Sequence, residues 1–246
     1  GIILLLTVAF LIPNKPESYG LKPYGYEDSG EASDGSGKAY VAQGLTLKQA
    51  IRTYPFWAII ISLPLLMIPA NGFATNASLI FQSVGFDAMG AATMLSVFSG
   101  ASIIWVLAYG VLSDKLGARK ANLFFTVLAI ISVGVFAVMG NMTGAIILAC
   151  TVGVVSAYAG MLGAVTYRTM FGTKAIGALI PLTSVASGVG SMIAPPIATA
   201  INAATGGYTG FMLLCVIVLV IVFVLIFTST TPKMTEKIKA MMAEDE

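Results

Sequence analysis

Residues 110–120 read GVLSDKLGARK, and they lie between two long apolar runs near residues 89–113 and 121–140. Each run has enough residues to cross a bilayer as a helix, because about 20 helical residues span the hydrocarbon core. Gly117 permits a tight reversal of the chain, and the charged residues around it suit the headgroup region of a membrane. The stretch therefore indicates a short surface turn between two membrane-spanning helices.

The composition places the whole chain among membrane proteins. Of its 246 residues, 57% are hydrophobic and 10% are charged, and the mean hydropathy is +0.92. Soluble domains carry about 25% charged residues. The chain has no histidine, and its two cysteines lie in apolar runs without the spacing of a metal site. We also find no nucleophile–base pair and no phosphate-binding loop. The sequence thus indicates neither an enzyme nor a metal, a cofactor or a nucleic-acid partner.

The hydrophobic pattern predicts six membrane-spanning helices. A backbone in lipid must satisfy its own hydrogen bonds, so apolar runs of about 20 residues form helices, whereas barrel strands are about half as long. The six runs lie near residues 55–82, 89–113, 121–140, 143–166, 175–203 and 208–230. We therefore predict an all-α membrane protein, a six-transmembrane-helix bundle in which short connections make successive helices antiparallel neighbours.

The segments outside these runs differ from them in composition. Residues 1–12 are apolar, but a helix of that length rises only about 18 Å, which is too short to span a bilayer. We interpret them as the end of a longer transmembrane helix rather than a signal-peptide core, because no basic region precedes them. Residues 13–54 predict a hydrophilic linker that contains a short surface helix starting at a capping box of Thr46 and Gln49. The expected segments are 1–12, 13–54, the bundle at 55–230 and a tail at 231–246.

The placement of the basic residues predicts the orientation in the membrane. With strict alternation of the six spans, all 13 Lys and Arg residues fall on one side, and the loops on the other side carry only Asp87. The positive-inside rule makes the basic side cytoplasmic. We expect a multi-pass protein of the plasma membrane, the bacterial inner membrane, with the linker and the C-terminus in the cytoplasm.

The turn resembles the signature loop of the major facilitator superfamily. The matching residues are Gly110, Leu112, Ser113, Asp114, Lys115, Gly117, Arg119 and Lys120. In that family the loop joins helices 2 and 3 on the cytoplasmic side, and a second copy joins helices 8 and 9. In this chain, the turn at residues 110–120 follows the linker, and this position fits the second copy. The resemblance implies the C-terminal half, helices 7–12, of a twelve-helix fold, with residues 1–12 as the end of helix 6.

The same resemblance implies a partner and a gate. The partner is the N-terminal six-helix half of the same protein. Asp114 is expected to help a cytoplasmic gate. The other residues of this gating motif are Gly110, Lys115, Gly117, Arg119 and Lys120.

A second resemblance concerns the branch of the family. Segments 16–23, 52–57, 171–177 and 187–196 are similar to the oxalate/formate antiporter branch, which is related to the monocarboxylate transporters. This resemblance implies an antiporter for a small organic anion. Members of the branch often carry an arginine where this chain has Val106, and no span contains a charged residue in its interior. A carboxylate would therefore take its countercharge from the other half.

Polar residues inside the spans are the candidates for a substrate path. Asn71, Thr75, Ser78 and Gln82 recur along one face of a helix. The remaining candidates are Ser99, Ser102, Trp105 and Tyr158. Alternatively, these side chains hydrogen-bond or pack between helices. Two rows of small residues, at 156–164 and 184–191, are expected to let helices approach closely.

The sequence thus predicts a secondary active transporter that moves a small solute across the lipid bilayer by alternating access. The alternatives are a non-transporting six-helix assembly or sensor protein, a facilitator for an uncharged solute, and a half-size transporter that works as a dimer.

Overall fold

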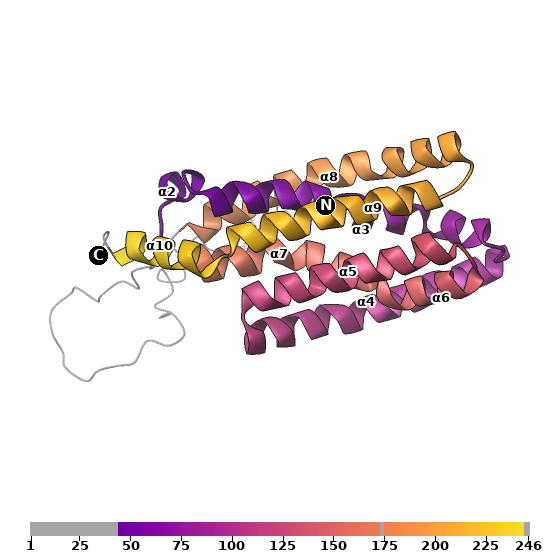
Figure 1. The fold of residues 1–246 in the computed structure, drawn as a ribbon, viewed down its shortest axis with the longest axis horizontal. Helices are drawn as coiled ribbons and strands as arrows, with labels where there is room; N and C mark the ends of the chain where they lie inside the picture. The colour runs from indigo at the N-terminus through magenta and orange to yellow at the C-terminus, as the bar shows by residue number, and fades with distance from the viewer. Residues whose placement is uncertain (1–43, 173–174, 244–246) are drawn as a thin grey trace, which may run out of the picture. The chain divides into compact units, whose positions relative to one another are not determined.

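Six helices of membrane-spanning length form the body of the protein. The structure is a computed structural model that describes residues 44–172 and 175–243. The sequence predictions for residues 1–43, including most of the linker, lie outside these described residues. The spanning helices are α3 (Tyr54–Ser83), α4 (Ala88–Leu116), α5 (Ala118–Met139), α6 and α7 together (Met142–Thr151 and Gly153–Phe171), α8 (Ile176–Thr205) and α9 (Thr209–Ser229). The predicted all-α six-helix bundle is confirmed, and the helices run roughly parallel to one long axis (Figure 1).

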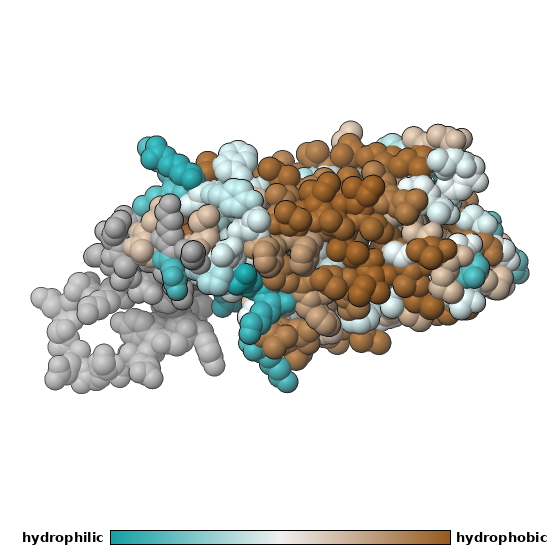
Figure 2. Space-filling view, viewed as in Figure 1, coloured by the Kyte–Doolittle hydropathy of each residue, from teal (hydrophilic) through white to brown (hydrophobic). Residues whose placement is uncertain are grey.

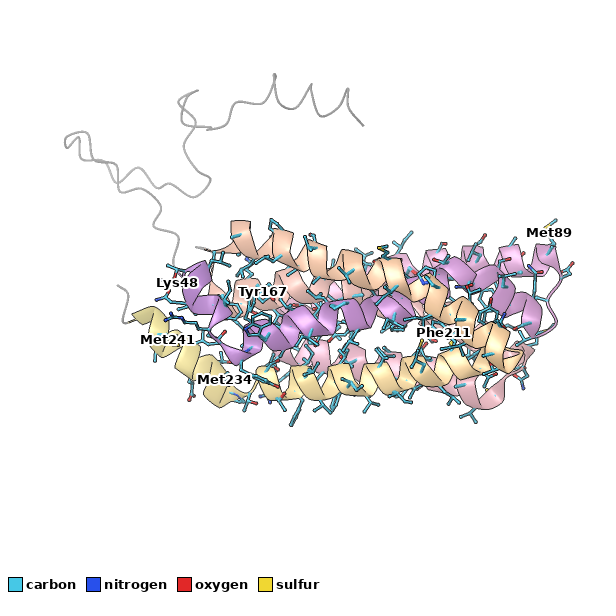
Figure 3. The ribbon with its side chains drawn as sticks, turned by 90° about the horizontal axis from the view of Figure 1, so that it is seen from above. Lys48, Met89, Tyr167, Phe211, Met234 and Met241 are labelled. Atoms are coloured by element: carbon cyan, nitrogen blue, oxygen red, sulfur yellow. The ribbon has the colours of Figure 1, made fainter. Side chains whose placement is uncertain are left out.

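Two shorter helices lie at one end of the bundle. They are α2 (Leu47–Ile51) and α10 (Pro232–Ala243). Thr46 and Gln49 form the capping box of α2, in which the Thr46 backbone N–H donates to Gln49 Oε1 at 2.8 Å. In Figure 3, Lys48 of α2 and Met234 of α10 lie at this end, whereas Met89 lies at the far end.

The described basic side chains gather at the end of the bundle that carries α2 and α10, which we call the basic end. They are Lys48, Arg52, Lys115, Arg119, Lys120 and Arg168. The turns at the opposite end carry Asp87 as their one charged residue in the described chain. Between the ends, apolar side chains cover the visible face of the bundle (Figure 2). This pattern is the one expected of a bundle that stands upright in a bilayer.

Helix α3 lies at the centre of the packing. It has its most extensive contact with α8 and also packs against α9 and α7, while α5 packs against α9. By contrast, α4 and α8 leave most of their surfaces uncovered within the described chain. The bundle therefore has a covered interior around α3 and an uncovered face formed largely by α4 and α8.

The signature turn is shorter than the sequence suggested. We expected a loop over residues 114–120, but α4 continues to Leu116 and α5 begins at Ala118, so Gly117 alone separates the two helices. Gly117 has φ +82° and ψ 152°, a conformation open to glycine and costly for other residues. The tight reversal at Gly117 is thus confirmed, and the residues on either side extend the helices.

The fourth span contains a break that the sequence did not reveal. The apolar run predicted near residues 143–166 consists of two helices, α6 and α7, which meet at Val152. A Cβ atom on Gly153 would lie 2.8 Å from the Cα of Ser102. Trp105 donates its indole N–H to the carbonyl oxygen of Cys150 at 2.9 Å. Helix α4 therefore packs directly against the break.

Candidate functional site

A cavity between α3, α7 and α8 is the best candidate for a substrate site. Its volume is about 450 Å³. The residues that line it are Leu63, Met67, Ala159, Gly160, Gly163, Ala164, Ile180, Thr183, Ser184, Ser187, Gly188 and Ser191. None of these lining residues carries a charge. The cavity opens on the uncovered face of the bundle, because Gly160, Ala164, Ser184 and Gly188 are all exposed.

Glycine residues decide where the helices touch and where they leave space. A Cβ atom on Gly190 would lie 2.4 Å from the Pro64 carbonyl oxygen, and one on Gly163 would lie 3.1 Å from Thr183 Cγ2. Gly160 and Gly188, in contrast, have no atom of the described chain within 4 Å of the Cβ position. We expected the rows containing Gly160 and Gly188 to let helices approach closely, but within the described chain these two glycines make no close approach. Gly160 and Gly188 line the cavity, and Gly163 and Gly190 make the close contacts.

Asn71 is the predicted path residue that adjoins the cavity. Its side-chain nitrogen donates to Ser191 Oγ at 2.9 Å and to Met67 Sδ at 3.3 Å, and both partners line the cavity. Asn71 thereby joins α3 to α8. The amide lies near the middle of both spans, as expected for a substrate site in a transporter.

The other predicted residues of α3 lie along the same uncovered side, toward the opposite end. Thr75 and Gln82 are exposed and Ser78 is half-buried. Gln82 donates to Ser78 Oγ at 3.0 Å, so these two side chains pair with each other. None of the three lines the cavity. They extend its polar surface along α3.

The predicted residues of α4 and α7 lie elsewhere in the bundle. Ser99 is exposed and donates to the Leu95 carbonyl oxygen, while Ser102 and Trp105 contact the break between α6 and α7. Tyr158 is fully buried, with its ring centroid 6.2 Å from that of Tyr109. The Tyr158 hydroxyl has no hydrogen-bond partner in the described chain. Helix packing, rather than the cavity, accounts for the positions of Ser102, Trp105 and Tyr158.

The gating motif surrounds two further cavities at the basic end. Gly110, Asp114 and Gly117 line one of about 630 Å³ between α4 and α7, together with Arg168. Arg119 and Lys120 line one of about 320 Å³ that reaches α9 and α10. Lys115 is exposed. No ion pair joins Asp114 to another residue in the part of the chain that the structure describes. Its carboxylate is therefore available to a group outside the described residues.

A buried polar network that was not predicted from the sequence lies beneath the gating motif. The Tyr109 hydroxyl donates to Asn122 Oδ1 at 2.5 Å, and Asn122 Nδ2 donates to Thr166 Oγ1 at 2.8 Å. The three residues come from α4, α5 and α7, and all are buried. An asparagine two residues inside an apolar run was the available signal, because buried amides require partners.

Comparisons with known proteins agree with this architecture. A sequence model of the Major Facilitator Superfamily matches residues 1–178. No curated protein sequence matches the chain. Among solved structures, the chain is similar to a variant of the E. coli fucose:proton symporter FucP, with 14% identity and a TM-score of 0.66. The match covers 94% of this chain and 53% of that one, so the chain spans about half the length of the symporter.

The fold follows from these findings. The six-helix bundle corresponds to half of the twelve-helix major facilitator fold, and the predicted fold class is confirmed. The family match covers well over half of the chain. The chain belongs to the Major Facilitator Superfamily.

Proposed function

We propose that the chain forms one half of a secondary transporter that moves a small solute by alternating access. The observation that carries the proposal is the polar, charge-free cavity that α3, α7 and α8 enclose at mid-span on the uncovered face. A second six-helix bundle, the N-terminal half of the same protein, would close this face and complete the site. Rocking of the two bundles would then expose the site to each side in turn.

One candidate solute is a small organic anion, exchanged by antiport. Its support is the resemblance of several segments to the oxalate/formate antiporter branch. The described helices offer this anion no cation near the cavity, since Val106 stands where the branch often has arginine and no lining residue is basic. An anion would therefore depend on a cation supplied by the N-terminal half.

A second candidate is an uncharged polar solute. The charge-free lining favours it, because moving an ion into a membrane interior without a paired charge is costly. The similar solved structure is named as a fucose:proton symporter, but at 14% identity it supports the fold alone. The choice between the two solute classes therefore rests on the cavity.

We further propose that the basic end is cytoplasmic and that Asp114 takes part in a gate there. The support is the positive-inside rule together with the six basic side chains described at that end. Arg119 and Lys120 would lie in the headgroup region. The protein would then be a multi-pass protein of the bacterial inner membrane.

The test of the proposed function is uptake by the complete protein in proteoliposomes. Radiolabelled carboxylates and uncharged polyhydroxylated solutes are supplied in parallel, with protein-free liposomes as the control. Saturable, protein-dependent uptake of any member supports transport, and its identity chooses between the two solute classes. If no member gives saturable uptake, the result would favour the alternative function, which is a non-transporting six-helix assembly or sensor.

A further inference from the structure

We propose that the cavity between α3, α7 and α8 binds the hydroxyl groups of a polyhydroxylated solute. The proposal rests on the proposed transport function and names the class of solute for the same site. It depends on which polar atoms of the cavity still have hydrogen atoms to donate and which have only lone pairs to offer.

Most hydrogen-bond donors around the cavity are already used. Both N–H groups of Asn71 are occupied, one by Ser191 Oγ and one by Met67 Sδ. Three hydroxyl groups of α8 also donate within their own helix. Thr183 and Ser184 donate to the Ile180 carbonyl oxygen at 2.6 and 3.1 Å, and Ser191 donates to the Ser187 carbonyl oxygen at 2.9 Å.

The lone pairs of the same groups remain available. A hydroxyl group that donates its one hydrogen atom still has acceptor capacity, and an amide whose nitrogen is occupied still has its carbonyl oxygen. Thr183, Ser184 and Asn71 therefore present oxygen acceptors at or beside the cavity. Ser187 is the one lining hydroxyl for which the described chain contains no hydrogen bond, so it is the one lining side chain with a hydrogen atom left to donate.

A cavity wall with several acceptors and one donor discriminates between solutes by the number of hydrogen-bond donors that they carry. A carboxylate offers only lone pairs. In this cavity it would face mostly oxygen acceptors, with Ser187 as the one donor to replace its lost hydration. An ammonium group would find acceptors but no countercharge in a charge-free cavity. A hydroxyl group donates to the wall without carrying charge and accepts from Ser187 in return. Several hydroxyl groups on one small solute would use several acceptors at once.

The proposal also covers an acid that carries hydroxyl groups. Its hydroxyl groups would lie against α3 and α8, while its carboxylate would lie away from this wall. The decisive feature of the solute is therefore its hydroxyl groups, whether or not a charge is present elsewhere.

The experiment measures how strongly solutes of equal carbon skeleton inhibit the uptake of a transported radiolabelled solute. It uses the complete protein in proteoliposomes. The pairs are glycolate with acetate, lactate with propionate, and glucose with deoxyglucose. The member of each pair that carries the additional hydroxyl group is expected to inhibit more strongly, by about fivefold for each hydrogen bond that the other member lacks. Oxalate and formate, which have no hydroxyl group, are expected to compete weakly.

Two variants test the cavity wall itself. Ser184→Ala removes one acceptor from an exposed position and is expected to raise the KM for the hydroxylated solute about fivefold, with Vmax unchanged. Ser191→Ala frees one Asn71 N–H to donate into the cavity, so the preference for hydroxylated solutes over their unsubstituted carboxylates should narrow. Ser96→Ala is the matched control. Ser96 makes the same kind of bond, to the Ala92 carbonyl oxygen at 3.1 Å, on α4 and outside the cavity.

The outcomes separate this proposal from the proposed function. Saturable uptake in which oxalate, formate or acetate competes best would overturn the hydroxyl assignment and leave transport standing. Equal changes of KM in Ser184→Ala and Ser96→Ala would show that the cavity does not bind the solute. The absence of saturable uptake for every solute would overturn the proposed function, and the hydroxyl assignment with it.

Discussion

Gly190 of α8 lies directly against Pro64 of α3, so close that a Cβ atom at residue 190 would fall 2.4 Å from the Pro64 carbonyl oxygen. This contact sets the separation of the two most extensively packed helices and thereby the width of the cavity beside it. Gly190→Ala must push the backbones apart, because the atoms it meets include backbone rather than the end of a flexible side chain. We expect a loss of about 1–3 kcal/mol in the free energy of unfolding.

Thermal unfolding of the purified protein in detergent, followed by circular dichroism, measures this effect. Gly188→Ala is the matched control on the same helix, since no atom among the described residues lies within 4 Å of its Cβ position. A stability change in Gly190→Ala no larger than that of Gly188→Ala would contradict the close contact.

Gly117 is predicted to be indispensable for the turn between α4 and α5. Its φ of +82° and ψ of 152° belong to a region that is almost exclusive to glycine. Gly117→Ala should therefore lower the free energy of unfolding by about 1–3 kcal/mol. Gly110→Ala, inside α4 with open space around it, should be neutral or slightly stabilising. Chemical unfolding of both variants in the same detergent compares them, and equal stabilities would argue against strain at Gly117.

The buried network is predicted to be cooperative. Asn122→Leu leaves the Tyr109 hydroxyl and the Thr166 hydroxyl without their shared partner, and Tyr109→Phe removes one bond from Asn122. Each single substitution should cost about 0.6–2 kcal/mol, the lower value being typical inside membranes. The double variant should lose less unfolding free energy than the sum of the two single losses. Once Asn122 is leucine, Tyr109→Phe removes a hydroxyl group that has already lost its partner. A double-mutant cycle on unfolding free energies measures the coupling, and strict additivity would show that the two residues do not interact.

The segment before α3 is predicted to be held to the α7–α8 turn by Gly44. Its neighbour Leu45 is fully buried, and the Leu45 N–H donates to the Phe171 carbonyl oxygen at 3.0 Å. Gly44 has φ +139°, and a Cβ atom there would fall 2.3 Å from the Phe171 carbonyl oxygen. The Lys48 side chain is exposed, but its backbone is held in α2. Gly44→Ala should detach the segment and release the backbone around Lys48 for cleavage by trypsin.

Limited proteolysis measures this detachment. Cleavage after Lys48 should be faster in Gly44→Ala by about tenfold for each 1.4 kcal/mol of lost anchoring. Gly207→Ala, in an open turn at the opposite end, is the control and should leave the rate unchanged. An unchanged cleavage rate in Gly44→Ala would mean that this backbone contact contributes nothing to holding the segment.

Asp114 is predicted to affect the rate of transport and leave folding intact. It is exposed and makes no ion pair in the described chain, so Asp114→Asn should keep the unfolding temperature. If its carboxylate stabilises one state of the gate by about 1.4 kcal/mol, its loss shifts that equilibrium about tenfold. Uptake in proteoliposomes should slow accordingly. Asp87→Asn is the control, because asparagine can still cap α4 as Asp87 does through the Gly90 N–H; equal uptake by the two variants would refute the gate.

The spans could be predicted from the sequence because each lipid-facing helix must be apolar and must satisfy its backbone hydrogen bonds within itself. Local signals also sufficed for the reversal at Gly117. The interruption at Val152 could not be predicted in this way, because Val152 keeps a helical backbone conformation and the residues that contact the interruption, Ser102 and Trp105, belong to another helix. The cavity was missed for a similar reason. Gly160 and Gly163 lie on one helix and look alike in sequence, and only the direction of the neighbouring helix decides which makes contact.

The contact between Leu45 and Phe171 has a mechanical consequence. The chain that precedes α2 is fastened to the turn after α7 before it reaches the first spanning helix. A force applied along that chain therefore acts first on the α7–α8 turn. It acts on α3 only after the hydrogen bond from the Leu45 N–H to the Phe171 carbonyl oxygen has broken. The two helices that follow and precede that turn, α8 and α7, are also two of the three walls of the cavity.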